Sequence, residues 1–150
     1  MEKNKMTELE IYEKKCDAIK EENARMLQLF EEDMVGLKPK TIDRHLDNVE
    51  FFLNTYLLRM GLNDYIKGMD YVDDYLGNFY IRKCMWSTPG NIKTTATSIK
   101  KFYQCMLKHE MIQKPDFECM CEKISENMWK WQGDCEMYND PDEINPFGFF

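Results

Sequence analysis

The stretch from residue 39 to residue 60 most constrains the fold, because its apolar side chains recur every three or four positions. The residues that define this pattern are Ile42, Leu46, Val49, Leu53, Tyr56, Leu57 and Met60. Such spacing gathers apolar side chains on one face of an α-helix. That face must be buried, so the chain needs further elements that pack against this helix.

The rest of the sequence supplies those elements as helices, because no long stretch alternates apolar and polar residues with period two. Residues 7–10 form a capping box that starts a first helix, and Gly61 ends the second. Asp116 is the expected N-cap of the last helix and Gly133 its expected C-terminal stop. The sequence therefore predicts an all-α bundle of about five helices, at about residues 8–34, 39–60, 69–85, 92–111 and 116–133.

A chain of 150 residues is long enough for one domain with a substantial core. We divide it into a helical extension, a central helical domain, a C-terminal helix and a tail, at residues 1–25, 26–115, 116–133 and 134–150. The tail is acidic and ends in Ile144-Asn-Pro-Phe-Gly-Phe-Phe150, which is either a docking peptide or a disordered end.

The chain has the sequence features of a cytosolic protein. It contains no run of about 18 apolar residues and no signal peptide, so we expect no membrane association. In the cytosol its six cysteines are expected to be reduced thiols, and several occupy apolar helix positions.

The net charge of −7 is unevenly distributed. Residues 1–34 carry a net charge of −4 and residues 115–150 carry −7, whereas residues 35–114 carry +4. Because salt limits the reach of the acidic flanks to about 10 Å at 0.1 M, the central segment can still present a cationic face.

Several short motifs in the central segment resemble one known family. They are Met26-Leu-Gln-Leu-Phe30, Leu37-Lys-Pro-Lys-Thr-Ile42, Val49-Glu-Phe-Phe-Leu53, Ser98-Ile-Lys-Lys-Phe-Tyr103 and Met111-Ile-Gln-Lys-Pro115. Together they resemble the SAM-like core-binding domain of phage integrases and other tyrosine recombinases. Lys114 departs from the pattern, because the family usually has Asn before this proline. The resemblance implies a SAM-like bundle that binds double-stranded DNA during DNA recombination or integration.

On this resemblance, the contact with DNA comes from the helices at 39–60 and 92–111. Lysines at a helix entry can meet phosphate, helped by the backbone N–H groups there. The expected DNA-binding residues are Lys38, Lys40, Thr41, Arg44, Lys93, Thr94, Thr97, Lys100, Lys101 and Lys108. The alternative is a protein-interaction module that kept this fold and lost DNA binding, which interspersed acids such as Asp43, Asp47 and Glu50 would favour.

We expect neither catalysis nor a metal or other cofactor. The catalytic arginines, histidine and tyrosine of recombinases belong to a following domain, and no residue here matches them. His45 and His109 have no Ser or Cys partner at a recognisable spacing. Cys119 and Cys121 point about 200° apart on a helix, so one zinc ion cannot readily use both.

The first helix carries a heptad-like seam, which consists of Leu9, Tyr12, Cys16, Ile19, Asn23, Met26 and Phe30. Two interpretations remain open: the seam packs against its own bundle, or it mediates self-association. For self-association the charges favour an antiparallel pair, in which Glu13 faces Lys20 of a second copy and Lys15 faces Glu22.

Overall fold

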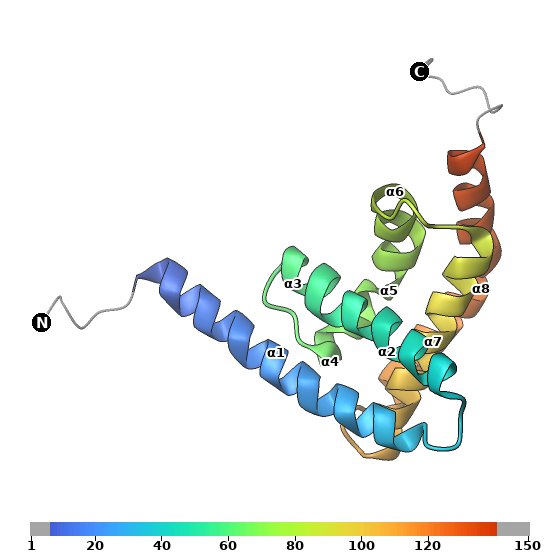
Figure 1. The fold of residues 1–150 in the computed structure, drawn as a ribbon. Coiled ribbons are helices and arrows are strands. Elements are labelled where there is room, and N and C mark those ends of the chain that lie inside the picture. Colours follow the sequence, from blue (N-terminus) through green and yellow to red (C-terminus); the bar gives the residue numbers. More distant parts are fainter. Residues whose placement is uncertain (1–6, 141–150) are drawn as a thin grey trace, which may run out of the picture.

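The expected all-α fold is confirmed by a computed structural model, which describes residues 7–140 (Figure 1). Five helical segments follow one another along the chain. They are α1 (Glu8–Asp33); α2 (Pro39–Glu50) continued by η2 (Phe51–Tyr56) and α3 (Leu57–Met60); α4 (Tyr65–Gly68), η3 (Met69–Tyr71), α5 (Val72–Asp74), η4 (Tyr75–Phe79) and α6 (Tyr80–Lys83); α7 (Pro89–Lys108); and α8 (Lys114–Asn139). Within residues 7–140, no helix combines the length and apolar character needed to cross a membrane.

Side-chain caps begin three of these segments. The hydroxyl of Thr7 accepts the backbone N–H of Glu10 at 3.1 Å, which confirms the predicted start of α1. Thr88 caps α7 in the same way. Asp64 caps α4, so the third segment begins four residues before the predicted start at Met69, which lies inside it.

The core is densest where two π-helical segments, η2 and η4, face each other through aromatic rings. The ring of Tyr75 lies 4.9 Å from that of Phe52 and 4.8 Å from that of Tyr56, measured between centroids. Tyr56 also meets Phe79 at 4.9 Å. These distances are typical of favourable aromatic pairs, which fix the second segment against the third.

The seam on α1 is divided between two environments. Its C-terminal part packs against the bundle: Asn23 is 1% exposed and Phe30 is 2% exposed. Its N-terminal part is not covered, since Leu9 is 65% exposed and Tyr12 42%. In Figure 1, the corresponding half of α1 projects away from the other helices as an arm, which we define as Glu8–Glu22.

The last helix is longer than the sequence indicated, and both of its predicted ends are wrong. It begins with Gln113 as N-cap and Pro115 in the first turn, so Asp116 is not the cap. It continues through Gly133 to Asn139, because tertiary contacts hold its last turns. Cys135 is fully buried, and the side-chain amide of Asn139 donates to the carbonyl of Ser87 at 2.7 Å. The predicted docking motif at 144–150 lies outside the described residues.

Candidate functional site

The central feature of the candidate site is the crossing of α2 over α7. His45 on α2 is 3% exposed, and its Nδ1 lies 2.7 Å from the hydroxyl of Ser98 on α7. Asn48 donates to the same hydroxyl at 3.1 Å, and Ser98 donates to the carbonyl of Thr94. When Ser98 donates its one proton to Thr94, Nδ1 of His45 is the donor in the bond between His45 and Ser98. This polar contact fixes how α2 and α7 lie together.

The crossing brings two predicted DNA-binding residues to the same place. Burial lowers the pKa of His45, and the positive charges of Arg44 and Lys101 lower it further. Arg44 comes from α2 and Lys101 from α7, and both are exposed. Arg44 and Lys101 belong to segments more than fifty residues apart, and the charge of each acts on the same buried histidine.

An open groove of 520 Å³ extends this basic region toward the end of α1. Leu37, which precedes Lys38, lies on one side of the groove, and Lys101 and Lys108 lie on the side formed by α7. The complete lining consists of Phe30, Asp33, Met34, Val35, Leu37, Lys101, Gln104, Cys105 and Lys108. The groove thus lies between the end of α1, the loop that leads to α2 and the C-terminal half of α7.

The other predicted residues are accessible, but none of them lines this groove. Lys38, Lys40, Lys93 and Lys100 are exposed, and Thr41, Thr94 and Thr97 are half-buried. Lys100 acts on Cys121 of α8, so it lies on the α8 side of α7. The hydroxyls of Thr94 and Thr97 donate to backbone carbonyls one turn earlier, which leaves phosphate no free hydroxyl proton there.

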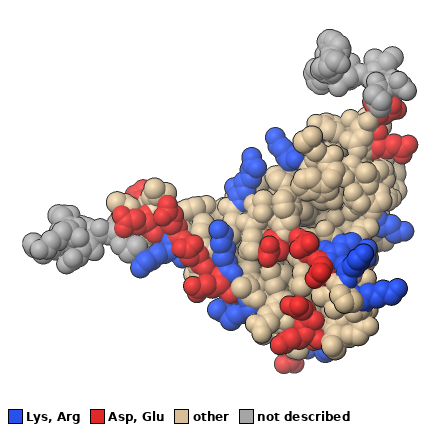
Figure 2. Space-filling model, viewed as in Figure 1, with Lys and Arg blue, Asp and Glu red and all other residues tan. Residues whose placement is uncertain are grey.

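Acidic residues border the basic region. Asp43 is exposed on α2, and Asp47 and Glu50 line a second groove between α2 and α1 together with Glu31. In Figure 2, Lys and Arg side chains lie beside groups of Asp and Glu side chains, so this face does not carry a single sign of charge.

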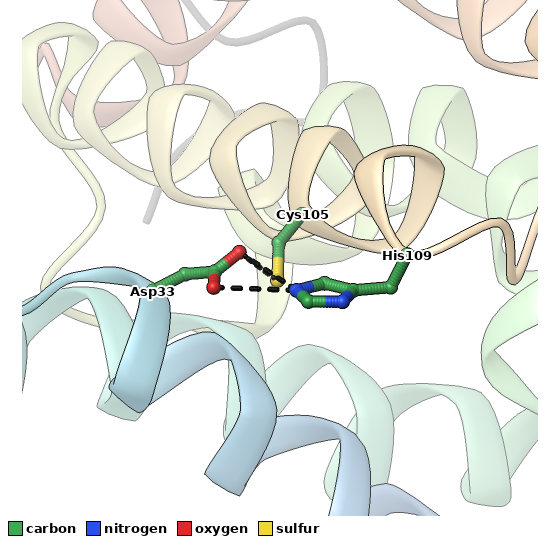
Figure 3. A group of neighbouring side chains, drawn as sticks. All are labelled: Asp33, Cys105 and His109. Atoms are coloured by element: carbon green, nitrogen blue, oxygen red, sulfur yellow. Dashed lines mark hydrogen bonds and ion pairs between the residues drawn. The ribbon is translucent and has the colours of Figure 1, made fainter.

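Sequence reasoning missed a polar cluster at one end of the basic groove (Figure 3). Asp33, near the end of α1, accepts a hydrogen bond from the thiol of Cys105 at 3.0 Å. Its two carboxylate oxygens lie 3.2 and 3.1 Å from Nε2 of His109, and Lys108 lies 3.5 Å away. The i, i+4 spacing of Cys105 and His109 on α7 was the available signal, but Asp33 is 72 positions from Cys105.

Electrostatics distinguishes this cluster from a nucleophilic triad. The hydrogen bond from Cys105 is the largest cause of the lowered pKa of Asp33; burial opposes it, and His109 and Lys108 make smaller contributions that also lower this pKa. Burial, followed by the hydrogen bond to Asp33, raises the pKa of the Cys105 thiol to about 12. A catalytic cysteine needs a base beside its sulfur and a low pKa. Here the hydrogen-bond partner of the thiol is the carboxylate and not the imidazole, and the metal-free thiol stays protonated.

Comparisons with known proteins provide no identification. No protein-family model matches the chain, and no curated protein or solved structure matches it either. The arguments about function therefore depend on the residues and their arrangement.

Proposed function

We propose that this chain is a non-catalytic DNA-binding domain that holds the duplex mainly through its phosphates. The observation that carries the proposal is that Arg44 of α2 and Lys101 of α7 both act on His45, which is buried where these helices pack together. Both side chains belong to the segment of net charge +4 in an otherwise acidic chain. The resemblance of that segment to the core-binding domain of tyrosine recombinases supports the same conclusion.

The arrangement favours phosphate contacts over reading of bases. Lysine and arginine bind phosphate as cations and position a protein on DNA without reading its sequence. The threonine hydroxyls that donate within α7 supply no direct donor to a base edge. Selectivity among DNA sequences is therefore expected to be low.

The experiment compares two double substitutions with the same change of charge. Arg44→Glu with Lys101→Glu alters the basic crossing. Lys67→Glu with Lys123→Glu alters a groove that also contains Asp70 and Asp116 and no residue of α2 or α7. Binding to a fluorescent duplex is measured by anisotropy at several salt concentrations.

The substitutions at the crossing should weaken binding at least about tenfold for every duplex sequence. They should also reduce the slope of log K against log salt by about 2, since each lost phosphate contact contributes roughly 0.9. The control pair should change affinity much less. An equal loss of DNA affinity in both variants would contradict the proposal, and so would the absence of DNA binding by the unaltered chain in low salt.

A specific observation favours a second function, protein interaction through the arm of α1. The arm presents Leu9, Ile11 and Tyr12 to solvent, with exposures of 65%, 42% and 42%. Isolated helices of about 15 residues are marginal in water, so this arm would gain stability from a partner. Self-association is the simplest case.

A further inference from the structure

The cluster at the end of α1 combines three kinds of side chain that bind zinc. Asp33 comes from α1, whereas Cys105 and His109 lie one turn apart on α7. One potential ligand atom from each residue lies within 4.8 Å of the other two. In Figure 3, all three side chains point toward one another from two packed helices. Carboxylate oxygen, thiolate sulfur and imidazole nitrogen are the usual protein ligands of Zn²⁺.

Two of the three distances between these atoms are close to those of a tetrahedral site, and the third is within 4.8 Å. Zinc bonds of about 2.0–2.3 Å at tetrahedral angles separate neighbouring ligand atoms by about 3.3–3.6 Å. The Cys105 sulfur is 3.0 Å from a carboxylate oxygen of Asp33, and Nε2 of His109 is 3.1 Å from the same oxygen. An entering ion needs to move these atoms apart by only a few tenths of an ångström.

The surroundings also leave room for a fourth ligand. Asp33 and Cys105 both line the open groove, from which water can reach the cluster. Lys108, at 3.5 Å from Asp33, opposes the binding of a cation here. Its side chain is 68% exposed, so it can turn toward solvent when a metal binds.

We propose that Asp33, Cys105 and His109 bind one zinc ion, with water from the groove as the fourth ligand. Asp33 contributes one carboxylate oxygen, His109 contributes Nε2, and Cys105 contributes its sulfur after releasing the thiol proton to solvent. The two negative charges of carboxylate and thiolate balance Zn²⁺. The ion joins the end of α1 to the end of α7. A soft sulfur ligand disfavours Mg²⁺ and Ca²⁺, which prefer oxygen.

The first experiment titrates ZnCl₂ into the metal-free, full-length protein kept reduced with a phosphine. A chromogenic chelator competes for the metal and reports the affinity. We expect one zinc per chain and a rise in melting temperature on zinc addition, because an ion that binds only the folded state stabilises it. MgCl₂ should produce neither effect.

Matched substitutions then locate the site. Asp33→Asn and His109→Gln should each weaken zinc binding at least about tenfold, since even supporting residues of metal sites cost that much. Cys119→Ser removes an exposed thiol of α8 and should leave zinc affinity unchanged. Lys108→Gln keeps all three ligands and removes the competing ammonium, so it should strengthen zinc binding. A purely structural hydrogen-bonded cluster predicts no such gain.

Cobalt provides a readout that does not depend on stability. Co²⁺ bound to thiolate gives a charge-transfer absorption, which should persist in Cys119→Ser and disappear in Cys105→Ser. Circular dichroism of each variant verifies that it is folded. Substoichiometric zinc in the unaltered protein would overturn the proposal. So would zinc affinity that survives Asp33→Asn and His109→Gln, or that is lost in Cys119→Ser.

Discussion

At the scale of single residues, His45 is the titratable group most closely tied to the α2–α7 crossing. It is buried with Ser98 and Asn48 as polar neighbours, and the cations Arg44 and Lys101 act on it. Burial, followed by the charges of Arg44 and Lys101, disfavours a charged imidazole. Its pKa in the folded chain is therefore below the ordinary value of 6.5, which the unfolded chain retains.

This shift makes stability depend on pH. Below about pH 6.5 the unfolded chain binds a proton at this position that the folded chain does not bind, so stability falls as pH decreases toward the folded pKa. His45→Asn keeps a donor near Ser98 but cannot titrate. Urea unfolding at about pH 7.5 and pH 5.5 should show that the free energy of unfolding changes less with pH in the variant than in the unaltered chain. At both pH values the variant should be less stable by about 1–3 kcal/mol. An unchanged pH dependence would argue against this role of His45.

A pair of glycines tests close packing at the same scale. A Cβ atom added to Gly77 would lie 2.6 Å from Cδ1 of the buried Trp131, whereas one added to Gly133 would meet nothing within 4 Å. Gly77→Ala should destabilise the fold by about 1–3 kcal/mol through overpacking. Gly133→Ala should be neutral or stabilise by up to about 1 kcal/mol, because Gly133 is inside a helix. Denaturant unfolding measures the stability of both variants. Similar losses of stability would mean that contact with Trp131 does not cause the destabilisation by Gly77→Ala.

At the scale of elements, the end of α8 belongs to the core rather than to a tail. Cys135 is fully buried near Ser87, and Asn139 bonds the backbone of Ser87. These contacts attach the last turns of α8 to the turn that precedes α7. This position changes how a C-terminal deletion should be designed.

A chain that ends at Gly133 should lose at least about 2 kcal/mol of stability, because it loses an apolar contact and a hydrogen bond of this region. A chain that ends at Asp140 keeps both and should melt at a higher temperature than the chain that ends at Gly133. Thermal unfolding followed by circular dichroism compares the two. Equal melting temperatures for all three chains would show that the last turns of α8 contribute nothing.

At the scale of the whole molecule, the arm of α1 is the surface through which two copies of the chain are expected to associate. The antiparallel pairing of Glu13 with Lys20 of a second copy also places Tyr12 opposite Asn23, and Asn23 is buried in its own bundle. Because the buried Asn23 is not accessible to a second copy, we expect the two copies to contact each other only through the arm. Sedimentation equilibrium should show a mass that rises with concentration, and Leu9→Glu with Tyr12→Glu should abolish the rise. Unfolding stability of the variant should stay within about 0.5 kcal/mol, as is usual at exposed sites.

The helices could be predicted from sequence because apolar periodicity is a local signal, and the segment from Pro39 to Met60 contains it almost throughout. The end of α8 could not be predicted in this way, because Gly133 is a local signal for the end of a helix. The helix continues past it because Cys135 is buried and Asn139 bonds Ser87. The basic residues of the candidate site were named individually from sequence. Their division between the groove and the α8 side depends on how α2 crosses α7, which no local pattern specifies.

The π-helical segment η2 has a further consequence for changes in chain length. Its i→i+5 bond, from the N–H of Leu57 to the carbonyl of Phe52, encloses one residue more than an α-helical turn. Deleting one residue between Phe51 and Tyr56 could restore an ordinary α-helix without opening the backbone. The N–H of Leu57 and the carbonyl of Phe52 would still close one turn, so α2 would keep its orientation relative to the aromatic core. This wide turn is thus a place where the chain can lose one residue while Arg44 and the rest of α2 stay in position.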